Sequence, residues 1–296
     1  MTPPIPTGRK NRADSPENAA GSGGEGPRVV AIGGGHGLAA TLRAARTYAS
    51  EVTAVVSVAD DGGSSGRLRA ALGIPAPGDL RRCLVALAES DDGLWPRAFE
   101  HRFDSGELQG HALGNLVIAG LAATTGSFVA ALAEAGRLVG ATGRVLPATE
   151  APVVLKAESY DGEVEGQLAV SQHGRIQRIA VVPPDAPATK ESVEAVERAD
   201  QIVLGPGSLY TSLLAALAVR DLGQAVAAAR EKVVYVANLR PQEPETSGYG
   251  LDEHVEALRA HGIDPGAVIP PEGMADASGA AHDPAALSAA LQDLLR

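Results

Sequence analysis

The chain has 296 residues, of which 45% are hydrophobic, enough to bury a large core in one large domain or two smaller ones. Its net charge of −11 argues against a nucleic-acid partner, because phosphate backbones require clustered Lys and Arg side chains and the 25 basic residues here are scattered. The single cysteine, Cys83, excludes an internal disulfide and a cysteine-rich zinc site. We therefore expect a protein of the reducing cytoplasm.

The first residues differ in composition from the rest. Residues 1–27 are rich in Pro and Gly and carry almost no large apolar side chain, which predicts a disordered tail before one α/β domain over residues 28–296. They contain no apolar core of a signal peptide. The uncharged stretch 112–133 is long enough to span a bilayer, but Asn115 and the break at 124–127 divide it. We expect two buried helices there and no membrane span.

Short apolar runs alternate with helical patterns along the rest of the chain. This alternation predicts a parallel sheet covered by helices on both faces. The four runs that we expect to form its buried strands are Arg28–Ile32, Val52–Val58, Gln201–Leu204 and Val233–Ala237.

The region between Val145 and Val182 has a different pattern. Its pieces are shorter and alternate between apolar and polar residues, so we expect strands at Val153–Glu158, Val164–Val170 and Ile176–Val182. They predict a small antiparallel β excursion from the parallel sheet. The end of the chain, Pro284–Arg296, places leucines on one helical stripe and predicts a closing helix.

In an open parallel sheet, ligands bind at the carboxyl ends of the strands, and the first strand ends in a glycine cluster. Leu38 stands where a dinucleotide fingerprint would have its last glycine, so that signal is weak. Four glycines are more than a tight turn requires, which favours phosphate contact over a turn that binds nothing. For His36 the sequence favours neither a ligand contact nor the alternative, a histidine that pins the backbone or lies exposed to solvent. The cluster comprises Gly33, Gly34, Gly35, His36 and Gly37.

The second strand ends in two carboxylates. Asp60 and Asp61 precede Gly63, Ser64 and Ser65. One carboxylate can accept a ribose hydroxyl, or both can bind Mg²⁺ beside a pyrophosphate. Adjacent side chains on a strand point to opposite faces, so the two converge only if the backbone turns. The serines can contact a ligand or simply cap the next helix.

A third strand end has a similar composition. Gly205, Gly207 and Ser208 precede a helix with hydroxyls in its first turn, a pattern typical of an anion site and also of an ordinary capped helix. Its recurrence at a third strand end favours the anion site. Asn238 closes the next strand, and its amide can hydrogen-bond a base or a sugar.

Two further segments contain polar groups of interest. Asp79 lies near the start of a helix with Arg81 one turn in, which by itself predicts a cap and solvated charges. His111 and Asn115 precede and enter an apolar helix, where polar groups are core residues or pocket residues. We favour the pocket for these two. Cys83 lies on an apolar helix face and is expected in the core.

Together these segments resemble the gluconeogenesis factor (YvcK) family, which shares a superfamily with the 2-phospho-L-lactate transferases (CofD). The matching motifs occur in order from residue 28 to about 262 and are highly specific as a set. They are Gly33-Gly-Gly-His-Gly-Leu, Val58-Ala-Asp-Asp-Gly-Gly-Ser-Ser-Gly-Arg-Leu, Pro77-Gly-Asp-Leu-Arg-Arg-Cys-Leu, Gly110-His-Ala-Leu-Gly-Asn, Leu204-Gly-Pro-Gly-Ser-Leu-Tyr-Thr-Ser and His254.

The resemblance implies a three-layer, Rossmann-like doubly wound sheet that binds a nucleotide sugar such as UDP-N-acetylglucosamine. Similar members are linked to carbon metabolism, cell shape and peptidoglycan synthesis without an established reaction. The further partners it implies are a second copy of the chain and proteins of cell-wall synthesis. In the transferase branch Mg²⁺ accompanies the nucleotide diphosphate, and Asp60 and Asp61 match the acidic residues that serve the metal. Tyr249 matches a ligand-contacting tyrosine of the UDP-sugar branch, and Arg81 belongs to the expected ligand site.

The chain departs from the common family pattern in places. His36 and Arg82 replace Thr and Asn of many members, and segment 239–246 loses a glycine and gains two prolines, which stiffens it. Our leading hypothesis is a non-catalytic, cytoplasmic UDP-sugar-binding regulator. The rivals are a Mg²⁺-dependent transferase of a nucleotide-activated phosphoester and an interaction protein with a vestigial site.

Overall fold

The computed structural model describes residues 25–296. The predicted tail lies mostly outside the described residues, since residues 1–24 are not among them. Gly26 and Pro27, at the end of this segment, directly precede the first strand, and their carbonyl groups accept hydrogen bonds from Ser50.

A six-stranded parallel sheet forms the centre of the protein. Its strand order is β3-β2-β1-β7-β8-β9, and every neighbouring pair is parallel. The strands are β1 (Arg28–Gly33), β2 (Glu51–Val56), β3 (Arg144–Pro147), β7 (Gln201–Leu204), β8 (Val233–Val236) and β9 (Ala267–Ile269). The chain runs outward from β1 to β3, then returns to β7 and continues the other way. The expected doubly wound sheet is confirmed, and its switch point lies between β1 and β7.

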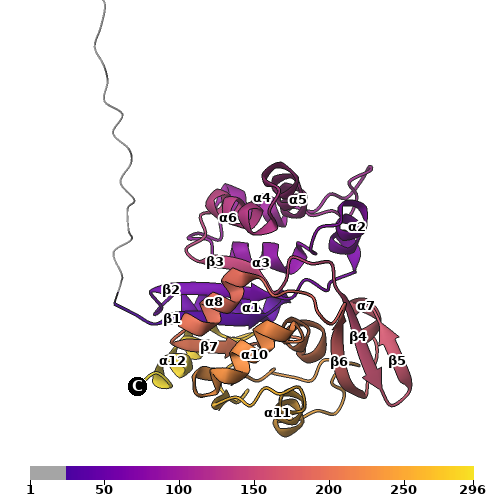
Figure 1. Ribbon diagram of the computed structural model, residues 1–296. Coiled ribbons are helices and arrows are strands. Elements are labelled where there is room, and N and C mark those ends of the chain that lie inside the picture. Colours follow the sequence, from indigo (N-terminus) through magenta and orange to yellow (C-terminus); the bar gives the residue numbers. More distant parts are fainter. Residues whose placement is uncertain (1–24) are drawn as a thin grey trace, which may run out of the picture.

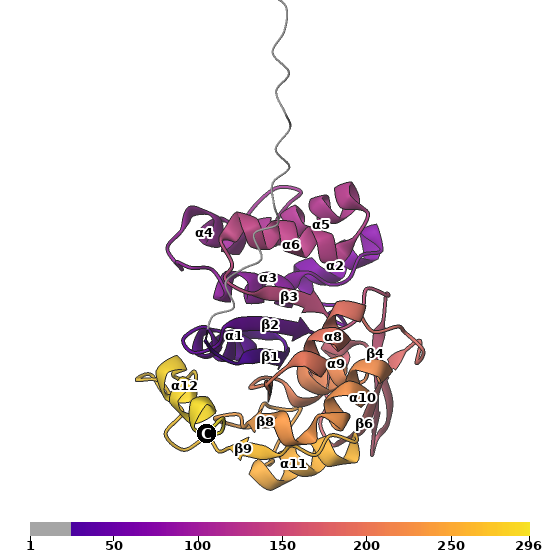
Figure 2. The same ribbon diagram turned by 60° about the vertical axis from the view of Figure 1, so that its left-hand side comes forward.

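Helices cover both faces of this sheet (Figures 1 and 2). One face carries α1 (Gly35–Ala45), α3 (Gly78–Ala86) and α12 (Pro284–Asp293); the other carries α8 (Lys190–Arg198) and α10 (Arg220–Ala228). The strands are buried along almost their whole length, which explains why their sequences are continuous apolar runs. Further helical segments are α2 (Gly63–Leu72), α7 (Gln167–Ser171), the π-helical η1 (Leu209–Leu214), α9 (Ala215–Leu217), η2 (Arg230–Lys232) and α11 (Leu251–Ala260).

A group of three helices lies beyond α3 at the β3 side of the sheet (Figure 2). It consists of α4 (Leu94–Glu100), α5 (Leu113–Thr125) and α6 (Phe128–Val139). Helices α5 and α6 confirm the division of the uncharged stretch 112–133 into two helices. Gly126, at φ 70°, ends the first, and the Ser127 hydroxyl accepts the Ala130 N–H to begin the second. No helix within residues 25–296 is long and apolar enough to cross a membrane.

The antiparallel excursion is a second, three-stranded sheet with the order β5-β4-β6. It contains β4 (Val154–Ser159), β5 (Gly162–Glu165) and β6 (Ile176–Val182). The strand expected at Val164–Val170 is wrong beyond Glu165. There Gly166 adopts φ 98°, which ends the strand, and residues 167–171 form α7 instead.

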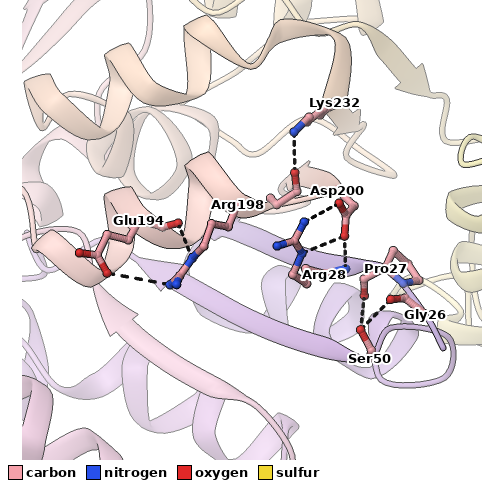
Figure 3. Close-up of polar contacts among 9 residues, drawn as sticks. Gly26, Pro27, Arg28, Ser50, Glu194, Arg198, Asp200 and Lys232 are labelled. Atoms are coloured by element: carbon pink, nitrogen blue, oxygen red, sulfur yellow. Dashed lines mark hydrogen bonds and ion pairs between the residues drawn. The ribbon is translucent and has the colours of Figure 1, made fainter. Parts of the chain in front are cut away.

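Polar contacts at the amino ends of the strands join β1 to its neighbours (Figure 3). The Arg28 guanidinium donates to both Asp200 carboxylate oxygens at 2.9 and 3.0 Å, next to the start of β7. The Ser50 hydroxyl donates to the Gly26 carbonyl at 2.7 Å, and Lys232 donates to the Ala199 carbonyl. This end of the sheet is therefore tied together, and the glycine-rich loops occupy the opposite end.

Candidate functional site

The first and third glycine-rich loops pack against each other at the switch point. The Thr41 hydroxyl donates to the Gly205 carbonyl at 2.7 Å. A Cβ atom on Gly37 would overlap the Pro206 carbonyl, and Gly205 has a φ of 76°. These glycines are therefore required by the approach of two backbones and by a left-handed conformation.

Gly34 is constrained by a different neighbour. A Cβ atom there would lie 2.6 Å from Asp79 Oδ2 and 3.2 Å from Ser212 Oγ. Gly33 and Gly35 adopt φ values of 155° and 66°. The four glycines thus have structural reasons of their own, and the number of glycines is weaker evidence for phosphate contact than the sequence suggested. His36 is exposed and lies next to them.

The two carboxylates of the second loop diverge. Asp60 Oδ1 accepts the Gly62 N–H at 2.9 Å, and Oδ2 faces Gly78 at the start of α3. Asp61 Oδ1 instead accepts the Leu168 N–H at 2.9 Å, and its Oδ2 lies against Gly166. Asp61 therefore caps α7 of the antiparallel excursion, while Asp60 remains at the carboxyl end of the parallel sheet.

A buried chain of hydrogen bonds links three of the predicted site residues to Ser64. Ser64 Oγ lies 3.0 Å from His111 Nδ1 and accepts the Asn115 amide at 3.0 Å. Asn115 Oδ1 in turn accepts Arg81 Nε at 3.1 Å. Burial, reinforced by the positive charges of nearby arginines, lowers the pKa of His111, so its neutral form is favoured. Of the two residues that we expected in a pocket, Asn115 lines a cavity and His111 is buried behind it through Ser64; a ligand contact of either stays a prediction.

Ser64, Arg81 and Asn115 line a cavity of about 280 Å³, which we call the polar cavity, whereas His111 is not part of its wall. The first turns of α2 and α3 both open onto it, and neither helix has a side-chain cap on its first N–H groups. Helix amino ends and guanidinium groups favour an anion. Its wall consists of Asp60, Gly62, Gly63, Ser64, Ser65, Gly78, Asp79, Arg81, Arg82, Arg102, Asn115 and Gln167.

The charges in this wall are partly paired. Arg81 is only 2% exposed and forms an ion pair with Glu100 at 2.6 Å. Arg82 donates to Asp79 at 2.7 Å, and Arg102 donates to the Gly110 carbonyl at 2.6 Å. Burial raises the pKa of Asp79, while Arg82 opposes this shift. The expectation of an ordinary cap with solvated charges is therefore wrong for this segment, because its side chains form a cavity wall.

A second cavity, of about 380 Å³, is lined in part by the first glycine loop. We call it the switch-point cavity, because it is lined by the loops that follow β1, β7 and β8. His36, Gly37 and Gly207 belong to it, with Asn238 and Gln242. Gln242 Oε1 is buried without a hydrogen-bond partner among the described residues, so an acceptor is available at this wall.

The third loop does not present a free helix amino end. Buried Glu245 accepts the Tyr210 N–H at 2.7 Å, the Thr211 N–H at 3.2 Å and the Thr211 hydroxyl at 2.9 Å. Asn238 bonds both the N–H and the carbonyl of Gly207, at 2.8 and 2.9 Å. The anion site expected at the start of η1 is therefore filled by an internal carboxylate.

Several sequence-selected residues line neither cavity, among them Asp61, His111, Ser208 and Tyr249. Tyr249 belongs to neither cavity wall, and its hydroxyl lies 3.0 Å from that of Tyr210. Ser208 precedes η1 without a side-chain cap bond. Cys83 is fully buried, which raises the pKa of its thiol and fits the expected core position. The ligand role expected for Tyr249 stays a prediction.

Sequence reasoning did not select Arg102, Gln167 or Gln242 as site residues. Arg102 lies on the segment before α5, and Gln167 begins α7, 107 positions after Asp60. No local motif marks either residue. Gln242 lies in the loop that departs from the common family pattern, which was the signal that could have drawn attention to it.

The candidate site offers few side-chain ligands for a metal ion. Among residues 25–296, no group of three or more His, Cys, Asp or Glu side chains is placed to hold a metal ion. Asp60 lines the polar cavity, whereas Asp61 is engaged with α7. This suits Mg²⁺ held by one carboxylate and ligand phosphates. Joint coordination by both carboxylates, as predicted, would require Asp61 to leave Leu168.

Comparisons with known proteins agree on the family. The family described as 2-phospho-L-lactate transferase CofD matches residues 29–277. The gluconeogenesis factor of Bacillus subtilis is 43% identical over 241 residues, which cover 80% of this chain and 76% of the relative. That of Halalkalibacterium halodurans is 43% identical over 236 residues, covering 79% and 73%. The putative gluconeogenesis factor of Mycobacterium tuberculosis is 45% identical over 247 residues, covering 79% and 72%.

A solved structure shows the same fold. The crystal structure of a member of the upf0052 family from Bacillus halodurans superposes with a TM-score of 0.83 at 34% identity, covering 91% of this chain and 100% of that one. The chain therefore belongs to the CofD family, and within it to the group of gluconeogenesis factors.

Proposed function

We propose that this protein binds a nucleotide sugar such as UDP-N-acetylglucosamine and acts as a cytoplasmic regulator linked to carbon metabolism, cell shape and cell-wall synthesis. One observation carries the proposal: the first glycine loop lines one cavity through His36 and Gly37, and its Gly34 packs against Asp79, which lines the other. One is strongly polar, and the other offers apolar surface with amide groups. A nucleotide diphosphate sugar has the same division into charged and weakly polar parts.

The polar cavity suits the diphosphate. Two uncapped helix amino ends and the Arg82 and Arg102 guanidinium groups can donate to phosphate oxygens. Arg81 is held by Glu100 and Asn115, so it shapes the wall more than it offers free donors. Neutral His111 keeps Ser64 in place without adding charge.

The switch-point cavity suits the nucleoside. The unpartnered Gln242 Oε1 can accept a base N–H, while Asn238 is already engaged with Gly207 and mainly fixes the loop. His36 stands exposed at the boundary of this cavity. The imidazole ring of His36 can stack on a base.

Isothermal calorimetry tests the proposal with UDP-N-acetylglucosamine, UMP and N-acetylglucosamine 1-phosphate. We expect the intact ligand to bind more tightly than either half, because it fills both cavities. Arg82→Gln should weaken it by roughly 10-fold, about 1.4 kcal/mol. Arg97→Gln is the matched control, since Arg97 is exposed on α4 and outside both walls. Absence of heat and of thermal stabilisation at millimolar ligand would refute the proposal.

The alternative is a Mg²⁺-dependent transferase of a nucleotide-activated phosphoester. It is favoured by the name of the matching family and by the position of Asp60 in the polar cavity. A bound Mg²⁺ would neutralise phosphate charge, and Asp60 would hold it. If transfer activity is found with a nucleotide-activated phosphoester, Asp60→Asn should abolish it without unfolding the protein. Full activity in that variant would remove Asp60 from this role.

A further inference from the structure

A third cavity, of about 390 Å³, lies beside the antiparallel sheet and shares no wall residue with the two cavities of the proposed nucleotide site. Its wall residues come mainly from β6 and from the segments η1, α9 and α10. Helices α9 and α10 lie next to β6 in Figure 2. We call this cavity the β6 groove. Its volume is in the range of ordinary ligand pockets, so it can hold a small molecule.

The floor of the groove is apolar and closed. Ile179 and Val181 contribute to it from β6, and Leu214 and Leu217 from η1 and α9; all four are buried. Because these residues belong to the core, the floor leaves no strand edge open to another chain. Apolar atoms of a small molecule that enters the hollow would be removed from water there, which is favourable.

One face of α10 forms the opposite side of the groove, and small residues on that face keep it hollow. Arg220, Gly223, Gln224 and Ala227 recur at intervals of three and four residues, which places them on one side of the helix. A Cβ atom on Gly223 would overlap the Leu217 carbonyl. The close approach of α10 to α9 therefore requires glycine here, and the centre of this helix face carries no side chain.

The rim of the groove carries positive charge that the chain itself does not neutralise. Arg178 and Arg220 line it, both are exposed, and neither forms an ion pair or a side-chain hydrogen bond within residues 25–296. The side-chain amide of Gln224, one turn after Arg220, has no hydrogen bond there either. Among the described residues no Asp or Glu lines the groove, although the net charge is −11. Glu158, opposite Arg178 in the strand pairing, and Asp221 lie outside its wall. Free guanidinium groups at a pocket favour an anionic ligand.

His261 also lines the groove but adds no charge to it. Its Nε2 accepts the Ile179 N–H at 3.1 Å, and its Nδ1 donates to the Ala257 carbonyl at 2.7 Å, which together require the neutral ring. Burial, and then the charge of Arg178, lower the pKa of His261. The positive charge of the rim therefore comes from the two arginines.

We propose that the β6 groove binds a small amphipathic anion, with its carboxylate or phosphate group at Arg178 and Arg220 and its apolar body on the floor beside Leu214 and Leu217. An anion without an apolar body would leave the floor in contact with water, and an uncharged molecule would leave the guanidinium groups unpaired. Both parts are therefore needed for tight binding. The inference does not depend on nucleotide binding, because the two sites share no wall residue and can fail separately.

Nuclear magnetic resonance of the full-length, ¹⁵N-labelled chain tests this proposal. The probes are 4-phenylbutyrate, 4-phenylbutylphosphonate, the neutral 4-phenylbutanol and acetate. We expect at least one of the two amphipathic anions to shift the amide resonances of Ala218 and Gly223 with saturation, and the tighter one identifies the head group. The alcohol and acetate should each bind at least 10-fold more weakly, because each lacks one of the two parts.

Variants separate the rim from the hollow. Arg178→Gln combined with Arg220→Gln should weaken binding of the amphipathic anion at least 10-fold and leave that of the alcohol within 2-fold. Ala227→Trp should fill the hollow and weaken the anion at least 10-fold, whereas Ala228→Trp, exposed on the same helix and outside the groove, should change it less than 2-fold. Unchanged resonances away from the groove show that each variant is folded.

Three results would overturn the proposal. The first is the absence of a saturable shift at Ala218 and Gly223 with either amphipathic anion at millimolar concentration. The second is equal binding of acetate or of the alcohol, because the groove would then be a site for any small anion or an uncharged hollow. The third is unchanged affinity of the amphipathic anion in the double arginine variant.

Discussion

Glu245→Ala removes the buried carboxylate that caps η1 and tests whether this group is structural. Glu245 is 3% exposed and accepts three hydrogen bonds, two from the backbone of Tyr210 and Thr211 and one from the Thr211 hydroxyl. Its removal leaves these donors without an acceptor in the protein interior. The unfolding free energy should therefore fall substantially at neutral pH.

The magnitude follows from the number of donors. A buried donor left unsatisfied costs about 1–3 kcal/mol, and the hydroxyl of Thr211 can rotate to find another partner. Two backbone N–H groups then give a loss of about 2–6 kcal/mol. Burial makes the ionised Glu245 carboxylate itself unfavourable in the folded protein, as its raised pKa indicates. Its removal therefore recovers part of the lost free energy, and we expect a loss in the lower half of this range. Glu245→Gln keeps one acceptor oxygen and should lose about half as much.

Urea unfolding followed by circular dichroism measures these losses. With a slope of about 3 kcal/mol/M for a chain of this size, a loss of 3 kcal/mol lowers the midpoint by about 1 M. Glu243→Ala is the matched control, because Glu243 is exposed on the same segment. A Glu245→Ala midpoint equal to that of the control would refute the structural role. Loss of nucleotide binding with unchanged stability would assign Glu245 to the ligand instead.

The same carboxylate predicts a pH dependence. Because burial raises the pKa of Glu245 in the folded state, the folded protein binds this proton more tightly than the unfolded chain does. This contribution to stability is present below the unfolded value of about 4 and is lost as the pH rises through the folded value. Glu245→Gln should remove that part of the slope, and an unchanged slope would contradict the assignment.

Three further changes give distinct outcomes. Gly34→Ala should cost about 1–3 kcal/mol in thermal unfolding, because the new methyl group would lie 2.6 Å from a carboxylate oxygen, while Gly120→Ala on an exposed helix face should cost nothing. Asp200→Asn should lose only about 0.5 kcal/mol at pH 7, and this difference should vanish as the pH falls to about 2, the pKa to which Arg28 lowers that carboxyl. Asp61→Ala should raise amide exchange in α7 about 10-fold with global stability within about 1 kcal/mol, and unchanged exchange would rule out its capping role.

The central strands could be predicted because their residues are buried on both faces and form continuous apolar runs. Gln201–Leu204 and Ile176–Val182 were predicted with their observed bounds. The edge strands β3 and β9 were missed. They have four and three residues, and β3 ends in Pro147, so neither contains a run long enough to distinguish a strand from a loop.

The site was predictable only where neighbouring residues in the sequence determine it. The glycines and hydroxyls after β1, β2 and β7 correctly indicated loops at the carboxyl ends of the strands. The partners of these loops come from distant segments: Glu245 reaches η1 across 35 positions, and Asp61 reaches Leu168 across 107. Local spacing contains no information on such contacts. It therefore could not show which of these loops already binds a carboxylate of the chain itself.

These distant contacts separate three loops that look alike in sequence. A helix amino end attracts one negative charge, and at η1 Glu245 already supplies it from within the chain. A ligand phosphate placed there would meet a buried carboxylate and be repelled. The first turns of α2 and α3 are not capped in this way, although Asp60 accepts the N–H of Gly62 just before α2, and both open onto one cavity with Arg82 and Arg102. An anionic ligand should therefore bind across α2 and α3, with the β7 loop contacting only its uncharged part.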